Sequence, residues 1–116
     1  MNQENIFVLH KGTIYQVDTE SGTYKKLSYN WDNTTCMAES PTKLYAVDQA
    51  CIYEIDKASG DHRILTDDNW TGSSLMVYKN NMLYVLHKKT IYKVHPETGA
   101  YEELSDDGWD ESTFMT

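Results

Sequence analysis

Apolar and polar positions along the chain follow a pattern that occurs three times. One recurring phrase is apolar at almost every position and covers residues 6–9, 44–47 and 83–86. A second phrase mixes apolar and polar positions and covers residues 14–18, 52–56 and 91–95. A third is mostly polar and covers residues 24–27, 62–65 and 101–104. Because β-branched and aromatic residues dominate the apolar positions, each phrase predicts a short strand.

A tryptophan marks the boundary between successive units. The interval is 39 residues from Trp31 to Trp70 and 39 residues again from Trp70 to Trp109. Each tryptophan is followed at one spacing by two small hydroxyl residues and then by a methionine, namely Met37, Met76 and Met115. A fixed period near 40 residues is the signature of a repeat architecture. We expect a fourth strand after each tryptophan, which gives four strands per unit.

The gaps between the phrases carry turn chemistry. Gly22, Gly60 and Gly99 lie between the second and third phrases of their units. A hairpin needs a positive φ at this place, which glycine adopts at little cost. No stretch shows a sustained period of 3.6 residues, so we expect almost no helix.

The four strands of a unit differ in polarity, and this difference predicts their order. The apolar phrase suits a strand packed between neighbouring sheets, and the mostly polar phrase suits an outer edge strand. Four antiparallel strands graded from buried to solvated describe a β-propeller blade, with the strand after the tryptophan innermost. The sequence therefore predicts an all-β fold, in which residues 1–116 form a single domain of three four-stranded antiparallel blades. The domain is circularly permuted, because it starts at the second strand of one blade and ends at the innermost strand of another.

The pattern resembles the blade repeats of bacterial β-propellers. The residues that carry the resemblance are Leu-Tyr-x-Val, Ile-Tyr-x-Val-Asp, Thr-Gly and the tryptophan, and they cover essentially the whole chain. The repeats are broadly similar to Kelch, NHL, quinoprotein-type and tectonin repeats, and the resemblance implies the propeller architecture. The Gly-Gly of Kelch and the Asp-box of sialidases are absent from the sequence. No family's functional residues are therefore carried over.

The two ends of the sequence have the phase of one continuous repeat. Met37 to Leu44 and Met76 to Leu83 each span seven residues, as does the path from Met115 through Thr116 and Met1 to Ile6. Natural propellers typically have four to eight blades, so three blades are too few for a ring. We expect a homodimer in which two chains form a six-bladed ring, with residues 112–115 of each completing the first blade of the other. The alternative is a monomer that packs its blade faces in another way.

Composition narrows the classes of partner. The net charge of −8 argues against nucleic acid and anionic membrane, because both require Lys and Arg at the contact. The first five residues lack the basic region of a signal peptide, and no apolar run approaches the length of a membrane span. We therefore expect a cytoplasmic protein.

The two cysteines are not expected to form a disulfide. Cys36 and Cys51 fall on strands that have one strand between them, so the two residues are separated by about 10 Å, which is too far for a disulfide bond.

The candidate ligand surface is one end of each blade. Antiparallel alternation brings the loop before the innermost strand to the same end as the turn after the apolar phrase. We expect Trp109 beside His10, Trp31 beside Asp48, and Trp70 beside His87, with Asp68 and Asp107 in the loops that precede two of the tryptophans. An aromatic platform beside polar groups suits a sugar ring. The competing interpretation is that each tryptophan packs blade against blade, and that the acidic residues only form turns.

The sequence gives no motif for catalysis, metal binding or a cofactor. It contains no nucleophile elbow, no glycine-rich phosphate loop and no paired histidines at ligand spacing, so we expect no enzymatic activity, no metal and no cofactor. His62 replaces Tyr24 and Tyr101 of the other units and is interpreted as surface variation. Two functions fit: a lectin-like binding module with repeated Trp-containing pockets for a glycan, or an intracellular protein-interaction module such as an inhibitor or immunity protein.

Overall fold

The computed structural model describes residues 5–106, 108, 109 and 112, and these residues form three antiparallel sheets. The first sheet has the order β1-β2-β3, comprising Asn5–His10, Thr13–Asp18 and Tyr24–Tyr29. The second has the order β4-β5-β6-β7, comprising Thr34–Glu39, Lys43–Asp48, Cys51–Asp56 and His62–Thr66. The third has the order β8-β9-β10-β11, comprising Ser73–Lys79, Met82–His87, Thr90–Val94 and Tyr101–Ser105.

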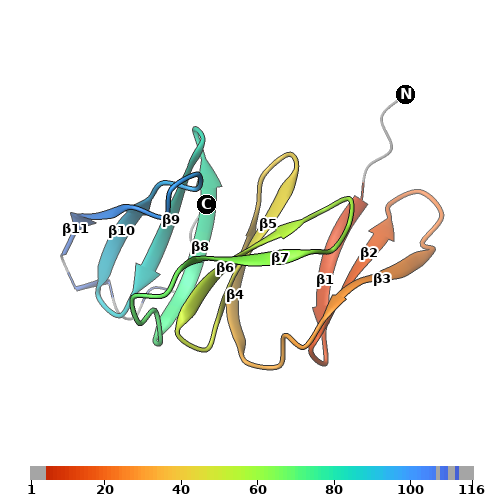
Figure 1. Cartoon of the computed structure of the whole chain (residues 1–116), viewed down its shortest axis with the longest axis horizontal. Helices are drawn as coiled ribbons and strands as arrows, with labels where there is room; N and C mark the ends of the chain where they lie inside the picture. Colours follow the sequence, from red (N-terminus) through yellow and green to blue (C-terminus); the bar gives the residue numbers. More distant parts are fainter. Residues whose placement is uncertain (1–4, 107, 110–111, 113–116) are drawn as a thin grey trace.

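The sheets stand side by side in chain order, with the second between the first and the third (Figure 1). The innermost strands β4 and β8 approach each other, as the common axis of a propeller requires. The predicted all-β fold and the blade-like order of strands are confirmed. The described part of the chain holds no α-helix, and therefore no helix able to cross a membrane.

The hairpins form because their turn residues accept a positive φ. Gly22, Gly60 and Gly99 have φ of 78°, 81° and 82°, as predicted. Asp18 and Asp56 precede two of these turns, and the carboxylate of each accepts a backbone N–H two residues later at 2.8 and 2.7 Å. Such local bonds hold the reversal of the chain without long-range contacts. The third unit has His95 at this position, but all three turns share one backbone bond, in which the glycine N–H donates to the carbonyl four residues earlier.

The core lies between the sheets and not within any one of them. One cluster joins the first and second sheets and contains buried Ile14, Trp31, Leu44, Ala46 and Ile55. A larger cluster joins the second and third sheets around Trp70. Each sheet buries a face only where another sheet covers it. Consequently, the outer face of the first sheet is open, and Ile6 and Val8 on β1 are 52% and 40% exposed.

Adjacent sheets come close at the hairpin glycines. A Cβ atom on Gly60 would collide with the backbone carbonyl of Leu27 in the first sheet, and one on Gly99 with the carbonyl of Leu65 in the second. Glycine at these places is thus required by the contact between sheets as well as by φ. Gly22 has nothing within 4 Å of the corresponding position, because no sheet lies beside it.

Candidate functional site

The tryptophans share one backbone setting. The backbone N–H of Trp31, Trp70 and Trp109 donates to the carbonyls of Gly12, Ala50 and Lys89 at 2.9, 2.9 and 3.1 Å. Each tryptophan carbonyl in turn accepts the N–H three residues later, from Thr34, Ser73 and Ser112. The indole N–H donates to a hydroxyl at the end of the preceding outer strand, namely Ser28 at 2.7 Å, Thr66 at 3.4 Å and Ser105 at 3.1 Å. In this setting the indoles of Trp31 and Trp70 reach the following sheet.

Trp70 fills a pocket on the third sheet. Its ring contacts Tyr92 on β10 and Tyr101 on β11 edge to face, with centroids 5.4 and 5.0 Å away, and His87 at 5.6 Å. Such edge-to-face contacts are the favoured geometry of aromatic pairs. Only 2% of Trp70 is exposed. The sequence pairing of Trp70 with His87 is correct in space, but the ring lies inside the core.

Trp31 fills the corresponding pocket on the second sheet. Its ring contacts Tyr53 at 5.1 Å and His62 at 5.3 Å, both edge to face, and it is 3% exposed. His62 is exposed, as expected of a surface position, but its ring also forms one wall of the Trp31 pocket. A signal was present: the same two columns carry aromatic rings in every unit, at Tyr15 and Tyr24, Tyr53 and His62, and Tyr92 and Tyr101.

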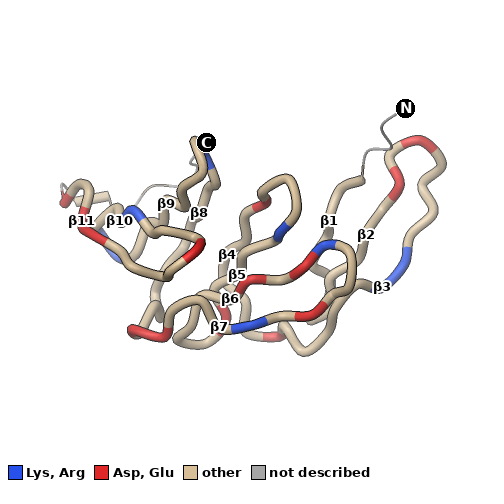
Figure 2. The backbone as a smooth tube through the Cα atoms, turned by 45° about the horizontal axis from the view of Figure 1, so that its top comes forward, with Lys and Arg blue, Asp and Glu red and all other residues tan. Residues whose placement is uncertain are grey.

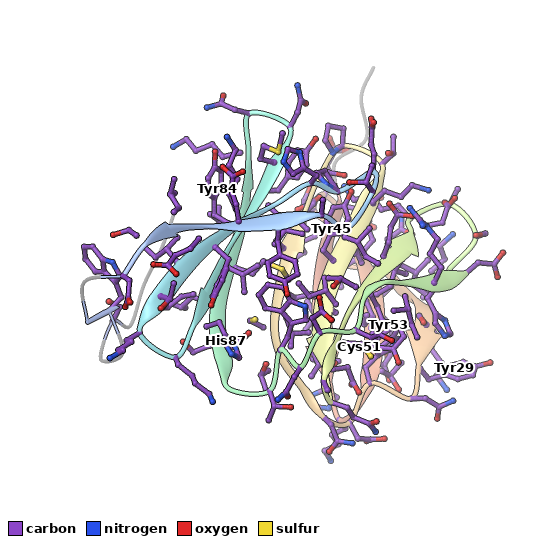
Figure 3. All side chains as sticks on the ribbon, turned by 60° about the vertical axis from the view of Figure 1, so that its left-hand side comes forward. Tyr29, Tyr45, Cys51, Tyr53, Tyr84 and His87 are labelled. Carbon is purple, nitrogen blue, oxygen red and sulfur yellow. The ribbon has the colours of Figure 1, made fainter. Side chains whose placement is uncertain are left out.

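The residues after the apolar phrase bond the innermost strand of their own blade. The Thr34 hydroxyl donates to the Asp48 carboxylate at 2.8 Å, and Ser73 Oγ lies 3.0 Å from His87 Nδ1. Asp48 is buried and His87 half-buried, and burial lowers the pKa of His87, with the neighbouring Lys88 charge adding to the effect. These side chains tie the inner strand to its neighbour, which is a structural task. Figure 3 shows His87 at the end of the third sheet.

The remaining predicted residues are distributed differently. His10 is exposed on the open face of the first sheet, and Trp109 is 38% exposed beyond the third. The strands that lead to them, β1 and β11, belong to the two outer sheets of the row (Figure 1). Asp68 accepts a hydrogen bond from the Tyr101 hydroxyl at 2.8 Å, which raises the pKa of Tyr101. Asp107 lies outside the described residues. Whether any of these residues binds a ligand stays a prediction.

The chemistry available for catalysis or metal binding is sparse. In residues 5–106, 108, 109 and 112, no three His, Cys, Asp or Glu side chains gather as a metal site would require. Cys36 and Cys51 are free thiols, both partly buried. Burial raises the pKa of Cys36 to about 11, so this thiol is protonated at neutral pH. A protonated thiol is a poor nucleophile and a poor metal ligand.

Comparisons with known proteins define the fold and nothing narrower. No family model matches the sequence, and no curated protein matches it. Among solved structures, the chain is similar to one from a nidogen/laminin complex, with a TM-score of 0.73, 13% identity, and coverage of 89% of this chain and 43% of that one. It is also similar to a protein of unknown function from Bacteroides thetaiotaomicron, with a TM-score of 0.68, 14% identity and coverage of 85% and 30%.

A third solved structure, virginiamycin B lyase from Staphylococcus aureus, gives a TM-score of 0.66 at 14% identity and coverage of 87% of this chain and 37% of that one. The chain therefore spans less than half the length of each of these three structures. At such low identity the likeness concerns the fold alone. The three sheets of this protein have a β-propeller-like arrangement.

Proposed function

We propose that this protein is a non-catalytic binding module that works as a homodimer, two chains forming one six-bladed propeller. The observation that carries the proposal is the open face of the first sheet. The described residues give this sheet three strands where the other two have four, and its β1 edge and apolar side chains are uncovered. Exposed strand edges and apolar faces invite pairing with another chain. The third sheet of a second copy would cover this face, as neighbouring sheets cover each other within the chain.

The predicted strand exchange is part of this proposal. Residues 112–115 of each chain would pair with β1 of the other and supply its innermost strand. Ser112 supports this, because its N–H bonds the Trp109 carbonyl at 3.1 Å as Ser73 bonds Trp70 at the start of β8. The similar solved structures support a larger ring as well, since each is more than twice as long as the part this chain matches.

The ligand of the ring is proposed from the blade ends. A lectin-like ring would bind a glycan at the end where the tryptophan loops and the turns after β1, β5 and β9 emerge. Trp31 and Trp70 are buried, so a glycan cannot stack on these two indoles. Its contacts would come instead from exposed polar groups such as Asp68. A glycan array probed with the labelled dimer tests it, with Asp68→Asn expected to weaken any saturable binding.

A protein-interaction module is the second candidate, and the charge distribution favours it. Acidic residues occur on all three sheets, and the chain carries a net charge of −8 (Figure 2). A surface of one dominant sign accelerates association with partners of the opposite sign. A pull-down should recover one basic protein whose binding weakens with salt. Recovery that is indifferent to salt would count against this function.

The first experiment is the native mass by light scattering on a sizing column. The chain has a mass of 13.4 kDa, and two chains give twice that value. A mass near two chains supports the ring. A mass of one chain across the accessible concentration range would overturn the ring, and with it the repeated blade ends proposed as a binding surface.

A further inference from the structure

The chain contains two completed examples of one joint between sheets. In each, a tryptophan from the end of one sheet enters an aromatic pocket on the next. Trp31 enters the pocket formed by Tyr53 and His62, and Trp70 enters the one formed by Tyr92 and Tyr101. The pocket walls also contact each other edge to face, at 5.7 and 5.9 Å. These joints show what a completed contact between two sheets looks like in this sequence.

The first sheet presents the same pocket with no indole in it. Tyr15 and Tyr24 lie edge to face at 5.6 Å, and His10 lies 6.4 Å from Tyr15. Together with Val8 and Val17 these residues line a cavity of about 380 Å³. We call these five residues the open socket.

The register places the open socket on the face that is buried in the other sheets. Val8 is paired with Tyr15 across β1 and β2, as Val85 is paired with Tyr92 across β9 and β10. Val85 is 0% exposed beneath Trp70, whereas Val8 is 40% exposed. Tyr24 is 71% exposed, whereas its counterpart Tyr101 bonds Asp68 of the preceding sheet. The open socket thus has the paired residues of the completed pockets but no tryptophan in it.

Trp109 makes the same hydrogen bonds as Trp31 and Trp70, but its indole does not lie in a pocket. Its backbone N–H, its carbonyl and its indole N–H make the hydrogen bonds that the other two tryptophans make. It is nevertheless 38% exposed, against 2% for Trp70. Trp109 is therefore oriented by the third sheet as Trp70 is oriented by the second, toward a sheet that the described chain does not provide.

The hairpin glycines give an independent sign of the same contact. Gly60 and Gly99 pack against the carbonyls of Leu27 and Leu65 on the preceding outer strand. Gly22 and Leu104 are the corresponding residues that have no such contact. A Cβ atom on Gly22 would have nothing within 4 Å, and Leu104 is 54% exposed whereas Leu65 is 8% exposed. Gly22 belongs to the sheet that carries the open socket, and Leu104 belongs to the sheet that carries Trp109.

The outer strands at these two faces carry opposite charges. Lys25 and Lys26 lie on β3, and Glu102 and Glu103 lie on β11. Figure 2 shows the basic stretch on β3 and the acidic stretch on β11, at the two ends of the row of sheets. Opposite charges steer two such faces together and disfavour the pairing of either face with itself. The charges therefore favour a head-to-tail contact with a second copy of this chain.

We propose that Trp109 of one copy occupies the open socket of a second copy, and that Gly22 of that second copy packs against the Leu104 carbonyl of the first. This inference rests on the proposed two-chain ring and names the residues that close it. Each ring contains two such joints, because each chain gives one tryptophan and one socket. By analogy with the bond between Ser73 and His87, Ser112 bonds His10 of the other copy.

The test begins with two single variants and a matched control. Trp109→Ala removes the plug, and Val8→Glu places a charge in the open socket. Both residues are already exposed in the single chain, so we expect circular dichroism spectra like that of the wild type. The control is Ile64→Lys, an exposed apolar residue at the column where β3 carries Lys26. A buried Trp anchor is typically worth a factor of about 30 or more, and each ring has two joints. We expect dimerisation to weaken at least about 100-fold in both variants and to remain in the control.

Mixing the variants tests the head-to-tail geometry. A dimer of Trp109→Ala with Val8→Glu has one wild-type joint, because its intact tryptophan meets its intact socket. We therefore expect the mixture to dimerise more strongly than either variant alone. The matched mixture is wild type with the Trp109→Ala/Val8→Glu double variant, a heterodimer that carries the same two changes but no wild-type joint. With only the double variant labelled, so that wild-type homodimers are not counted, we expect less heterodimer there.

The outcomes separate this inference from the ring itself. A wild-type chain that is monomeric overturns both. A wild-type dimer that Trp109→Ala and Val8→Glu leave unchanged keeps the ring and overturns the socket. Single variants that are monomeric but show no complementation when mixed overturn the head-to-tail joint. Complementation in the first mixture and not in the second supports it.

Discussion

The open face of the first sheet and the covered face of the third are built from the same residue columns, yet they have opposite environments. Leu83 and Val85 on β9 are fully buried against the second sheet, whereas Ile6 and Val8 on β1 are about half exposed. The strands, their registers and their hairpins correspond. The difference is the neighbour: the third sheet has one on this face and the first does not. Burial in this protein is therefore a property of the joint between sheets and not of the repeat.

The tryptophans give the largest test of this comparison. Trp70→Ala should lower the free energy of unfolding by about 3–5 kcal/mol, because it empties a buried pocket between two sheets. This is a large part of the stability of a small domain, so we expect a mostly unfolded variant. Trp109→Ala should cost far less at low protein concentration. Urea unfolding followed by circular dichroism measures both, and equal losses would show that the two sites are not different.

A matched pair of valines provides the second test. Val85→Ala should cost about 2–3 kcal/mol, since it removes two methyl groups from the core and leaves a cavity. Val8→Ala removes the same atoms from an exposed strand and should cost under about 1 kcal/mol in the dilute chain. Because both substitutions remove the same atoms, most of the difference between their costs reports the burial of the position. A Val8→Ala cost that rises with protein concentration would indicate that a second chain covers this face.

The hairpin glycines give a third test with identical backbone strain. Gly60→Ala and Gly22→Ala both place an L-residue at φ near +80°, which costs about 1 kcal/mol. Gly60→Ala adds a collision with the Leu27 carbonyl, and overpacking of this kind typically costs about 1–3 kcal/mol more. The difference between the two midpoints of urea unfolding measures the close approach of the sheets. Two equal midpoints would show that the sheets separate freely at this hairpin.

The repeat made the fold predictable, because each unit carries its own strands and turns. Strands and turns are determined by residues close to them in the sequence, such as the apolar segments and the hairpin glycines Gly22, Gly60 and Gly99. The role of the tryptophans was harder to predict. An indole beside a histidine or an aspartate suits a ligand platform and a packed joint equally well, and only the position of Tyr53 or Tyr92 on the next sheet distinguishes them. The open socket was not predictable, since Val8 and Val85 are equivalent in the sequence.

The smallest effect concerns pH and the completed Trp70 pocket. Burial holds the pKa of His87 below its usual value near 6.5, so the folded chain favours the neutral ring. As the pH falls below about 6.5, the unfolded chain takes up this proton first, and stability decreases until the folded pKa is passed. Stability should therefore fall with acidification over this window in the wild type, and less so in His87→Gln. The imidazole resonance of His87, followed by NMR, should titrate below pH 6.5. A midpoint at or above that value would show that the completed pocket does not desolvate its histidine, and that the joint is looser than its aromatic contacts indicate.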